Sequence, residues 1–124
     1  MDIKSIVASI LATLESADFM TIYALSIIYK EETKQKIEIS PFHISEVLHQ
    51  LVEEGYAIEY EESTLDLSKK FNKKIYIATD KLSTIAKPLP DKVLQIAKFR
   101  YVTLVFYILV NYPSYIKTLT TSVS

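Results

Sequence analysis

The chain contains one glycine, Gly55, and only four prolines. Tight turns with a positive φ depend mainly on glycine, and glycine and proline are also the residues that interrupt helices. A fold of many short strands joined by tight turns is therefore disfavoured. We expect a mainly α-helical chain, and its 124 residues and hydrophobic fraction of 49% suffice for one folded core.

The spacing of apolar residues predicts the order of helices and strands. In chain order we expect a helix over 3–15, a second from about 18 into the polar run 30–36, and a very short strand over 37–39. A third helix is expected from Ser40 to Gly55, followed by strands over 56–60 and 74–78. A short helix over 79–87 and a last helix over 91–112 complete the chain order. Ser40 followed by Pro41 is a strong helix start, and Gly55 is a strong helix stop. The polar stretch 61–73 is predicted to be a long hairpin loop.

This order of three helices, a glycine stop and two strands around a basic segment resembles that of winged helix-turn-helix proteins. The segment SPFHISEVLHQLVEEGYAIEY at 40–60 resembles their recognition helix and first wing strand, and KKIYIATDKLSTIAK at 73–87 resembles the second wing strand and the next helix. The rhythm of Leu48, Leu51, Gly55 and Ile58 is similar to that of the PadR-like and MarR-like groups, and the richness in Ile, Tyr and Lys resembles archaeal or archaeal-virus proteins.

The resemblance implies a mainly α fold with a small β-hairpin wing, that is, a winged helix-turn-helix plus a long C-terminal helix. It covers residues 1–87, over which it implies a winged helix-turn-helix domain. The apolar pattern beyond them predicts a C-terminal dimerisation helix over 88–112, and the Ser/Thr-rich end predicts a flexible tail over 113–124. The function that it implies is that of a dimeric, sequence-specific regulator of transcription that binds double-stranded DNA.

In helix-turn-helix proteins the third helix enters the major groove. The residues expected to contact DNA from this helix are Ser40, His43, Ser45, Glu46, His49 and Gln50. Gln50 is suited to adenine and Glu46 to the amino group of cytosine. The alternative is a solvated helix face or a protein contact, and Glu46, Glu53 and Glu54 count against DNA because like charge near phosphate is unfavourable.

The hairpin segment supplies the second set of DNA contacts. Residues 1–62 carry four lysines and twelve acidic residues, whereas residues 63–124 carry ten basic and three acidic residues. Within the basic part, the expected phosphate contacts are Lys69, Lys70, Asn72, Lys73 and Lys74. The alternative for such a run is a turn that only improves solubility.

The last predicted helix is apolar around nearly its whole circumference, because its polar residues Arg100, Thr103, Tyr107 and Asn111 form one narrow strip. A helix of this kind has to be covered on more than one side. We expect the chain's own core to cover one face and a second copy to cover the other. The residues expected in this homodimer interface are Phe99, Tyr101, Leu104, Val105, Ile108, Leu109 and Tyr112. Complete burial in its own domain and docking on a membrane surface are the alternatives.

Other functional classes find little support in the sequence. The chain has no cysteine, and His43 and His49 are too far apart on a helix to bind one metal ion, so we expect no metal site. One glycine cannot form a glycine-rich phosphate loop, and no nucleophile is grouped with a base, so neither an enzyme nor a cofactor is expected. No secretory signal is apparent, and the apolar stretch 99–110 spans about 18 Å as a helix, against about 30 Å of bilayer hydrocarbon, so we expect a cytoplasmic protein. A winged-helix module that binds protein and no DNA is the alternative function.

Overall fold

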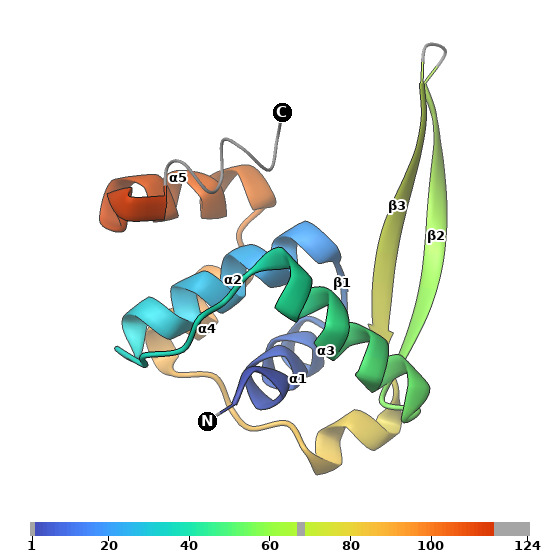
Figure 1. The fold of residues 1–124 in the computed structure, drawn as a ribbon, viewed down its shortest axis with the longest axis horizontal. Coiled ribbons are helices and arrows are strands. Elements are labelled where there is room, and N and C mark those ends of the chain that lie inside the picture. The colour runs from blue at the N-terminus through green and yellow to red at the C-terminus, as the bar shows by residue number, and fades with distance from the viewer. Residues whose placement is uncertain (1, 67–68, 116–124) are drawn as a thin grey trace.

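The computed structural model describes residues 2–66 and 69–115, and for residues 62–66 and 69–72 it describes the backbone alone. The elements in chain order are α1 (Ile3–Leu14), β1 (Ser16–Asp18), α2 (Phe19–Glu32), α3 (Pro41–Glu53), β2 (Ala57–Asp66), β3 (Lys69–Ala78), the 3-10 helix η1 (Asp80–Thr84), α4 (Asp91–Ala97), α5 (Tyr101–Asn111) and the 3-10 turn η2 (Pro113–Tyr115). The chain is thus mainly helical, with a small antiparallel sheet (Figure 1). None of the helices in the described ranges has both the length and the apolar character needed to cross a membrane.

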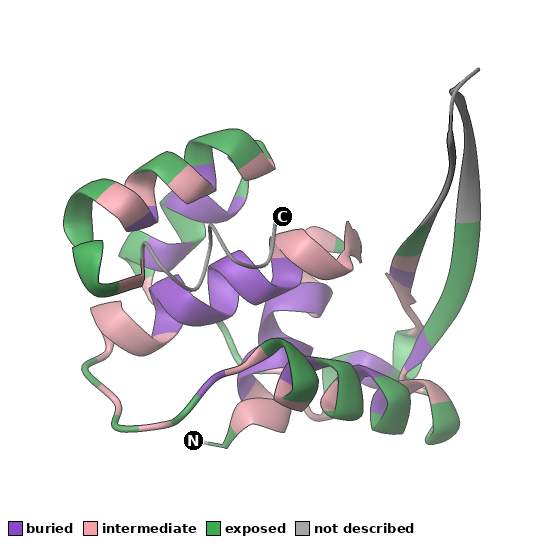
Figure 2. Cartoon of the chain, turned by 45° about the horizontal axis from the view of Figure 1, so that its top comes forward, coloured by how far each residue is buried: buried purple, intermediate pink, exposed green. Residues whose placement is uncertain are grey.

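Helix α2 lies at the centre of the molecule. Every residue from 22 to 29 is buried, so the helix is covered all round. Helices α1 and α3 pack on one part of its circumference, and α4 and α5 pack on another (Figures 1 and 2). Within this run, Ser26 donates its hydroxyl proton to the carbonyl of Ile22 at 2.7 Å. A helix that is apolar on all faces is stable in water only in such a central position.

The sheet has the strand order β1–β3–β2. The two long strands β2 and β3 form the predicted hairpin, which projects from the body beside the C-terminal end of α3 (Figure 1). Strand β1 was not predicted, because three residues are too short to show a periodic pattern; it pairs with Ile75–Ile77 of β3. Buried Ala57 and Tyr76 lie on the sheet face that packs on the helices.

Three predictions on the local structure were wrong. The expected loop over 61–73 is mostly strand, because β2 and β3 stay paired from Ala57↔Ala78 to Asp66↔Lys69. Residues 37–39 are not a strand, and of the expected helix over 79–87 only η1 forms. The third helix, by contrast, was predicted to within two residues.

The prediction of one long helix over 91–112 is also wrong. It is broken into α4 and α5 by residues 98–100, where Arg100 takes an extended conformation with φ −66° and ψ 155°. Both pieces pack on α2, so the break lets one chain segment follow the surface of a single helix. The flexible tail was predicted to begin at residue 113, which is too early, because Tyr115 in η2 packs on the core. Residues 116–124 lie outside the described residues.

Candidate functional site

Helix α3 is fixed at both ends by local chemistry. The hydroxyl of Ser40 accepts a hydrogen bond from the backbone N–H of His43 at 3.2 Å, and Pro41 occupies the first turn. Gly55 ends the helix with φ 81°, a conformation that glycine adopts without strain. Between these ends, Ile44, Leu48 and Leu51 are fully buried against the core, where α3 packs on α1.

The opposite side of α3 faces solvent. Of the residues expected to contact DNA, Ser45, Glu46, His49 and Gln50 are exposed. Together with Phe42, which is 69% exposed, they line a shallow hollow of about 320 Å³. Ser40 and His43 are half-buried and lie close to each other, with 3.1 Å between the hydroxyl oxygen and Nδ1 of the ring. The structure therefore places all six predicted residues on α3 or at its N-cap and leaves four of them exposed.

The C-terminal part of α3 is acidic, but its carboxylates have partners. Glu53 lies 3.2 Å from His49, and Glu54 lies 2.8 Å from the amino group of Lys4 on α1. The amino group of Lys81 donates to the backbone carbonyl of Glu54 at 2.7 Å. The contact with Lys4 partly balances the negative charge at the end of the helix that lies next to the hairpin.

The hairpin lysines lie on a strand and face acidic residues across the sheet. The register of β2 and β3 pairs Lys69 with Asp66, Lys73 with Glu62 and Lys74 with Glu61. Lys70 differs from the others, because it is opposite Leu65. Opposite charges directly across an antiparallel pair stabilise the sheet and reduce the net positive charge that the hairpin presents. The side chains of Lys69, Lys70 and Asn72 lie outside the described residues.

At the base of the hairpin the lysine side chains have further partners. The amino group of Lys73 is 3.8 Å from a carboxylate oxygen of Asp18, and that of Lys74 is 4.0 Å from one of Glu59. Both lysine side chains are about half exposed, at 52% and 53%. Their contacts are solvent-exposed ion pairs, which hold lysine side chains only weakly.

A cluster of apolar side chains on the hairpin was not singled out from the sequence. Ile58 is 55% exposed and Tyr60 is 43% exposed. They are opposite Ile77 and Ile75, so these four side chains share the sheet face that points away from the helices. Residues 56–60 are Tyr-Ala-Ile-Glu-Tyr, which indicates a strand but does not show which side chains turn toward the helices.

The C-terminal helix α5 presents two different faces. Leu104 and Ile108, predicted in the dimer interface, are fully buried in the chain's own core, and that prediction is wrong for both. Four further residues of the predicted interface are only half-buried and pack on the same core: Tyr101, Val105, Leu109 and Tyr112. Phe99 alone among the predicted interface residues belongs to the outer, exposed side. The sequence pattern could not separate the two faces because both are apolar.

A hydrogen-bonded cluster around Glu32 attaches α5 to α2. The carboxylate of Glu32, whose side chain is 15% exposed, accepts hydrogen bonds from the hydroxyls of Tyr112 and Tyr107, the latter at 2.8 Å. Lys92 on α4 lies 3.2 Å from its second oxygen. The pKa of Glu32 is lowered from its usual value by the hydrogen bonds from Tyr112 and Tyr107 and by the contact with Lys92. Partial burial of the carboxylate acts in the opposite direction and raises the pKa. The neighbouring Tyr115 donates to Glu31 at 2.8 Å.

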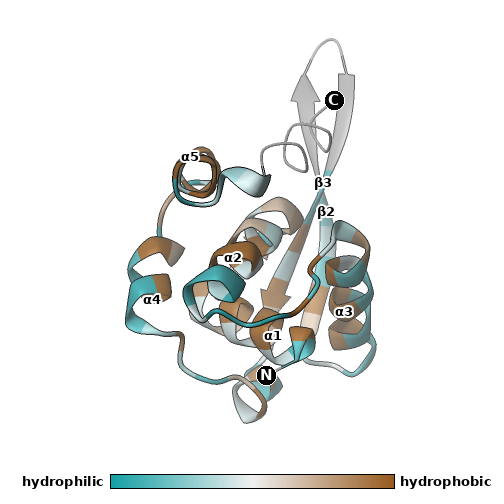
Figure 3. Ribbon diagram, turned by 60° about the vertical axis from the view of Figure 1, so that its left-hand side comes forward, coloured by the Kyte–Doolittle hydropathy of each residue, from teal (hydrophilic) through white to brown (hydrophobic). Residues whose placement is uncertain are grey.

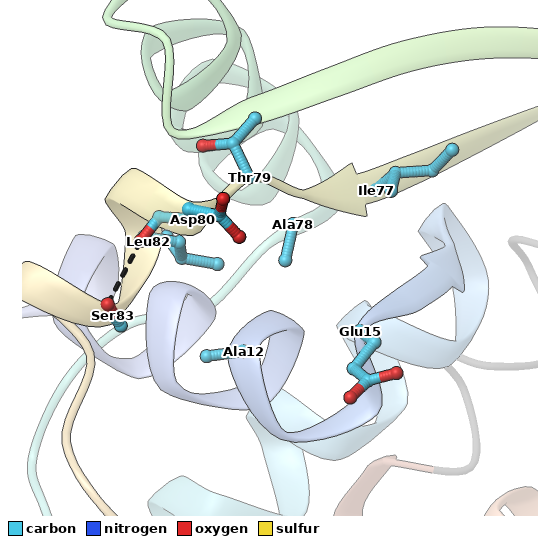
Figure 4. Close-up of a pocket in the computed structure, with 8 residues that line it drawn as sticks. All are labelled: Ala12, Glu15, Ile77, Ala78, Thr79, Asp80, Leu82 and Ser83. Atoms are coloured by element: carbon cyan, nitrogen blue, oxygen red, sulfur yellow. Dashed lines mark hydrogen bonds between the residues drawn. The ribbon is translucent and has the colours of Figure 1, made fainter.

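Figure 4 shows a second hollow, between the end of α1, the end of β3 and η1. Its volume is about 550 Å³, and it is lined by Ala12, Glu15, Ile77, Ala78, Thr79, Asp80, Leu82 and Ser83. The two ionisable groups in this lining are both carboxylates, and the Ser83 hydroxyl donates to a backbone carbonyl at 2.9 Å. The lining therefore offers no nucleophile paired with a base. Within residues 2–66 and 69–115, no three histidine or acidic side chains gather in a way that would hold a metal ion.

Comparison of the chain with protein-family models, with curated proteins and with solved structures finds no significant match.

Proposed function

We propose that the protein is a winged helix-turn-helix regulator of transcription that binds double-stranded DNA as a homodimer. The observation that carries this proposal is the position of α3. It is a well-capped helix whose polar outer face is open to solvent, and a hairpin with four lysines projects beside it (Figure 1). An exposed helix of this kind fits the major groove, and a basic hairpin next to it fits the flanking phosphates.

The roles of the α3 residues follow from their positions. Gln50 and Ser45 offer hydrogen-bonding groups from the exposed face, and the Gln50 amide is suited to the N6 and N7 atoms of adenine. Glu46 accepts a hydrogen bond from N4 of cytosine. His49 donates to a base or a phosphate when its contact with Glu53 is broken.

The cross-strand pairs indicate which hairpin lysine contributes most to phosphate binding. A lysine opposite a carboxylate gains less from a phosphate, because its charge is already partly balanced. Lys70, opposite Leu65, has no such neighbour in the strand register. We therefore expect Lys70 to contribute more to phosphate binding than Lys69, Lys73 or Lys74.

The test is fluorescence anisotropy with a labelled 30-base-pair duplex of mixed sequence, titrated at about 50 and 200 mM salt. Each phosphate contact steepens the dependence of log affinity on log salt by about 0.9. The variant Lys69→Gln/Lys70→Gln is expected to bind more weakly and to flatten this slope. The control Lys34→Gln/Lys87→Gln removes the same charge from exposed positions outside the hairpin and α3 and is expected to retain the slope. No binding at the lower salt, or equal slopes in the two variants, would contradict the proposal.

One observation favours a second candidate function, a module that binds protein through α3. The exposed surface of this helix combines Phe42 with Glu46, Glu53 and Glu54, which suits a basic amphipathic peptide. The variant Glu46→Gln/Glu53→Gln separates the two functions, because it removes repulsion from phosphate but also removes attraction for a basic peptide. Tighter binding of the duplex supports DNA as the ligand. Weaker binding of a labelled lysine-rich amphipathic peptide, with no binding of the duplex, supports the protein-binding module.

A further inference from the structure

The outer side of α5 carries an apolar strip that is open to solvent. The strip consists of Val102, Phe106 and Val110, which are 63%, 63% and 77% exposed, together with Phe99 just before the helix, which is 48% exposed. Positions four residues apart lie on one face of a helix, so the three helical members are in line. Figure 2 shows the outer turns of α5 exposed, and Figure 3 shows how strongly apolar this helix is.

We infer that this strip is the surface through which two copies of the chain associate, with their α5 helices antiparallel and crossing at Phe106. The inference deepens the proposed homodimer and rests on that part of the proposed function. It does not require DNA binding.

The distribution of charge favours a second copy as the occupant. No residue from Tyr101 to Tyr115 is charged, so the strip offers nothing that would select a basic or an acidic partner. A helix that lies on a membrane surface carries lysines and arginines along its polar face, and α5 has none within these bounds. A neutral apolar strip is complementary to itself, as the interface of a two-fold dimer has to be.

The position of Arg100 favours the antiparallel orientation. This exposed residue is the N-cap of α5, where the helix dipole is positive, and its side chain makes no capping hydrogen bond. A cation is favourable at the opposite end of a helix, where the last carbonyls carry partial negative charge. In an antiparallel pair centred on Phe106, position 100 of one copy is opposite position 112 of the other. Each Arg100 then lies beside the carbonyl end of the other helix, where Tyr112 is the C-cap.

The size of the strip indicates a small interface and therefore a weak, reversible dimer. Two phenylalanines about half exposed and two valines present about 400 Å² of apolar surface. A pair of strips therefore buries about 800 Å², compared with about 1,200–2,000 Å² for a complete stable interface. Exposed Thr103 and Asn111 beside the strip supply a polar rim.

The first experiment measures the mass of the full chain in solution by sedimentation and light scattering at micromolar concentrations. We expect a dimer, and we expect Phe106→Glu to be a monomer with the far-ultraviolet circular dichroism of the native chain. Phe42→Glu is the matched control, because this phenylalanine is equally exposed but lies on α3; it is expected to remain a dimer. A monomeric native chain at about 100 µM, or a dimeric Phe106→Glu variant, overturns the inference.

The second experiment uses the absence of cysteine from the chain to test the orientation by disulfide cross-linking. In the antiparallel pair Phe106→Cys cross-links to itself, and Val102→Cys cross-links to Val110→Cys when the two are mixed. Val102→Cys alone does not cross-link, because its two copies are offset by about 12 Å along the axis and a disulfide needs Cα atoms within about 7 Å. Efficient cross-linking of Val102→Cys to itself indicates a parallel pair and overturns the orientation.

The remaining outcomes separate this inference from DNA binding and from a membrane role. A dimer that does not bind the 30-base-pair duplex refutes the proposed DNA binding and leaves this inference standing. A monomer that binds the duplex refutes this inference and the proposed homodimer, and leaves DNA binding standing. Flotation of a monomeric chain with phosphatidylcholine–phosphatidylserine vesicles, lost in Phe106→Glu, assigns the strip to a lipid surface and overturns the inference.

Discussion

The attachment of α5 to α2 through Glu32 can be tested by a single isosteric substitution. Glu32→Gln keeps the size and one acceptor oxygen of the side chain but removes its negative charge. The hydroxyls of Tyr107 and Tyr112 then donate to a neutral group in place of a carboxylate. Hydrogen bonds to charged groups contribute about 1.5–3 kcal/mol and neutral ones about 1 kcal/mol, so the two bonds together lose about 1–4 kcal/mol. We add nothing for Lys92, because its amino group is well solvated.

The assay is urea unfolding monitored by circular dichroism at pH 7, at a fixed protein concentration. We expect Glu32→Gln to lower the free energy of unfolding by the amount given above. Glu38→Gln is the control, because Glu38 is exposed in the connection between α2 and α3 and the same charge is removed; it is expected to change the free energy by less than about 0.5 kcal/mol.

The pH dependence of the same measurement adds a second criterion. Since the folded-state pKa of Glu32 is lowered from its usual value of 4.5, its ionised form stabilises the fold above about pH 4.5. This stabilisation is lost as the pH falls through the folded-state pKa. The difference between the native chain and Glu32→Gln should therefore be full at pH 7 and narrow below about pH 4.5. Equal stability at pH 7, or a difference that persists unchanged at low pH, would refute the reasoning.

Three further substitutions test the framework that presents α3. Leu48→Ala removes a fully buried side chain and should lower the free energy of unfolding by about 2–5 kcal/mol in urea titrations. Ser40→Ala removes the side-chain cap and should cost about 1 kcal/mol, while Ser40→Asp should retain most of it in the same assay. Gly55→Ala meets no atom within 4 Å, so a loss of about 1 kcal/mol on thermal unfolding would come from the positive φ alone, and a loss above about 3 kcal/mol would contradict this account.

Local signals in the sequence were sufficient for α3. Ser40, Pro41 and Gly55 act through their own backbone and side-chain chemistry, so the ends of this helix could be predicted without knowledge of the rest of the fold. The outer face of α3 followed from the same pattern, because an inward stripe of Ile44, Leu48 and Leu51 leaves the other side exposed.

The elements that were missed depend on partners far away in the chain. Strand β1 forms because β3 offers it an edge, and the register of the hairpin beyond residue 61 places acidic residues opposite lysines. The strand that pairs with β1 and the residues that lie opposite the hairpin lysines cannot be identified before the strand register is known. In α5, both faces are apolar, so only the packing on α2 distinguishes buried Leu104 from exposed Phe106. The break at Arg100 has the same origin, because no proline or glycine marks it.

The short length of β1 leaves much of the sheet margin open. Within the described residues, β1 pairs with β3 only over Ile75–Ile77, and the other side of β2 has no neighbouring strand. Exposed edge strands of this kind can pair with strands of other molecules. Lysines on an edge strand oppose such pairing because their charged amino groups are difficult to desolvate. We therefore expect the lysines of residues 69–74 to oppose association through this edge whether or not a ligand is bound. Replacing them all with apolar residues is expected to produce aggregates before a loss of affinity can be measured, which is why glutamine is the appropriate substitute.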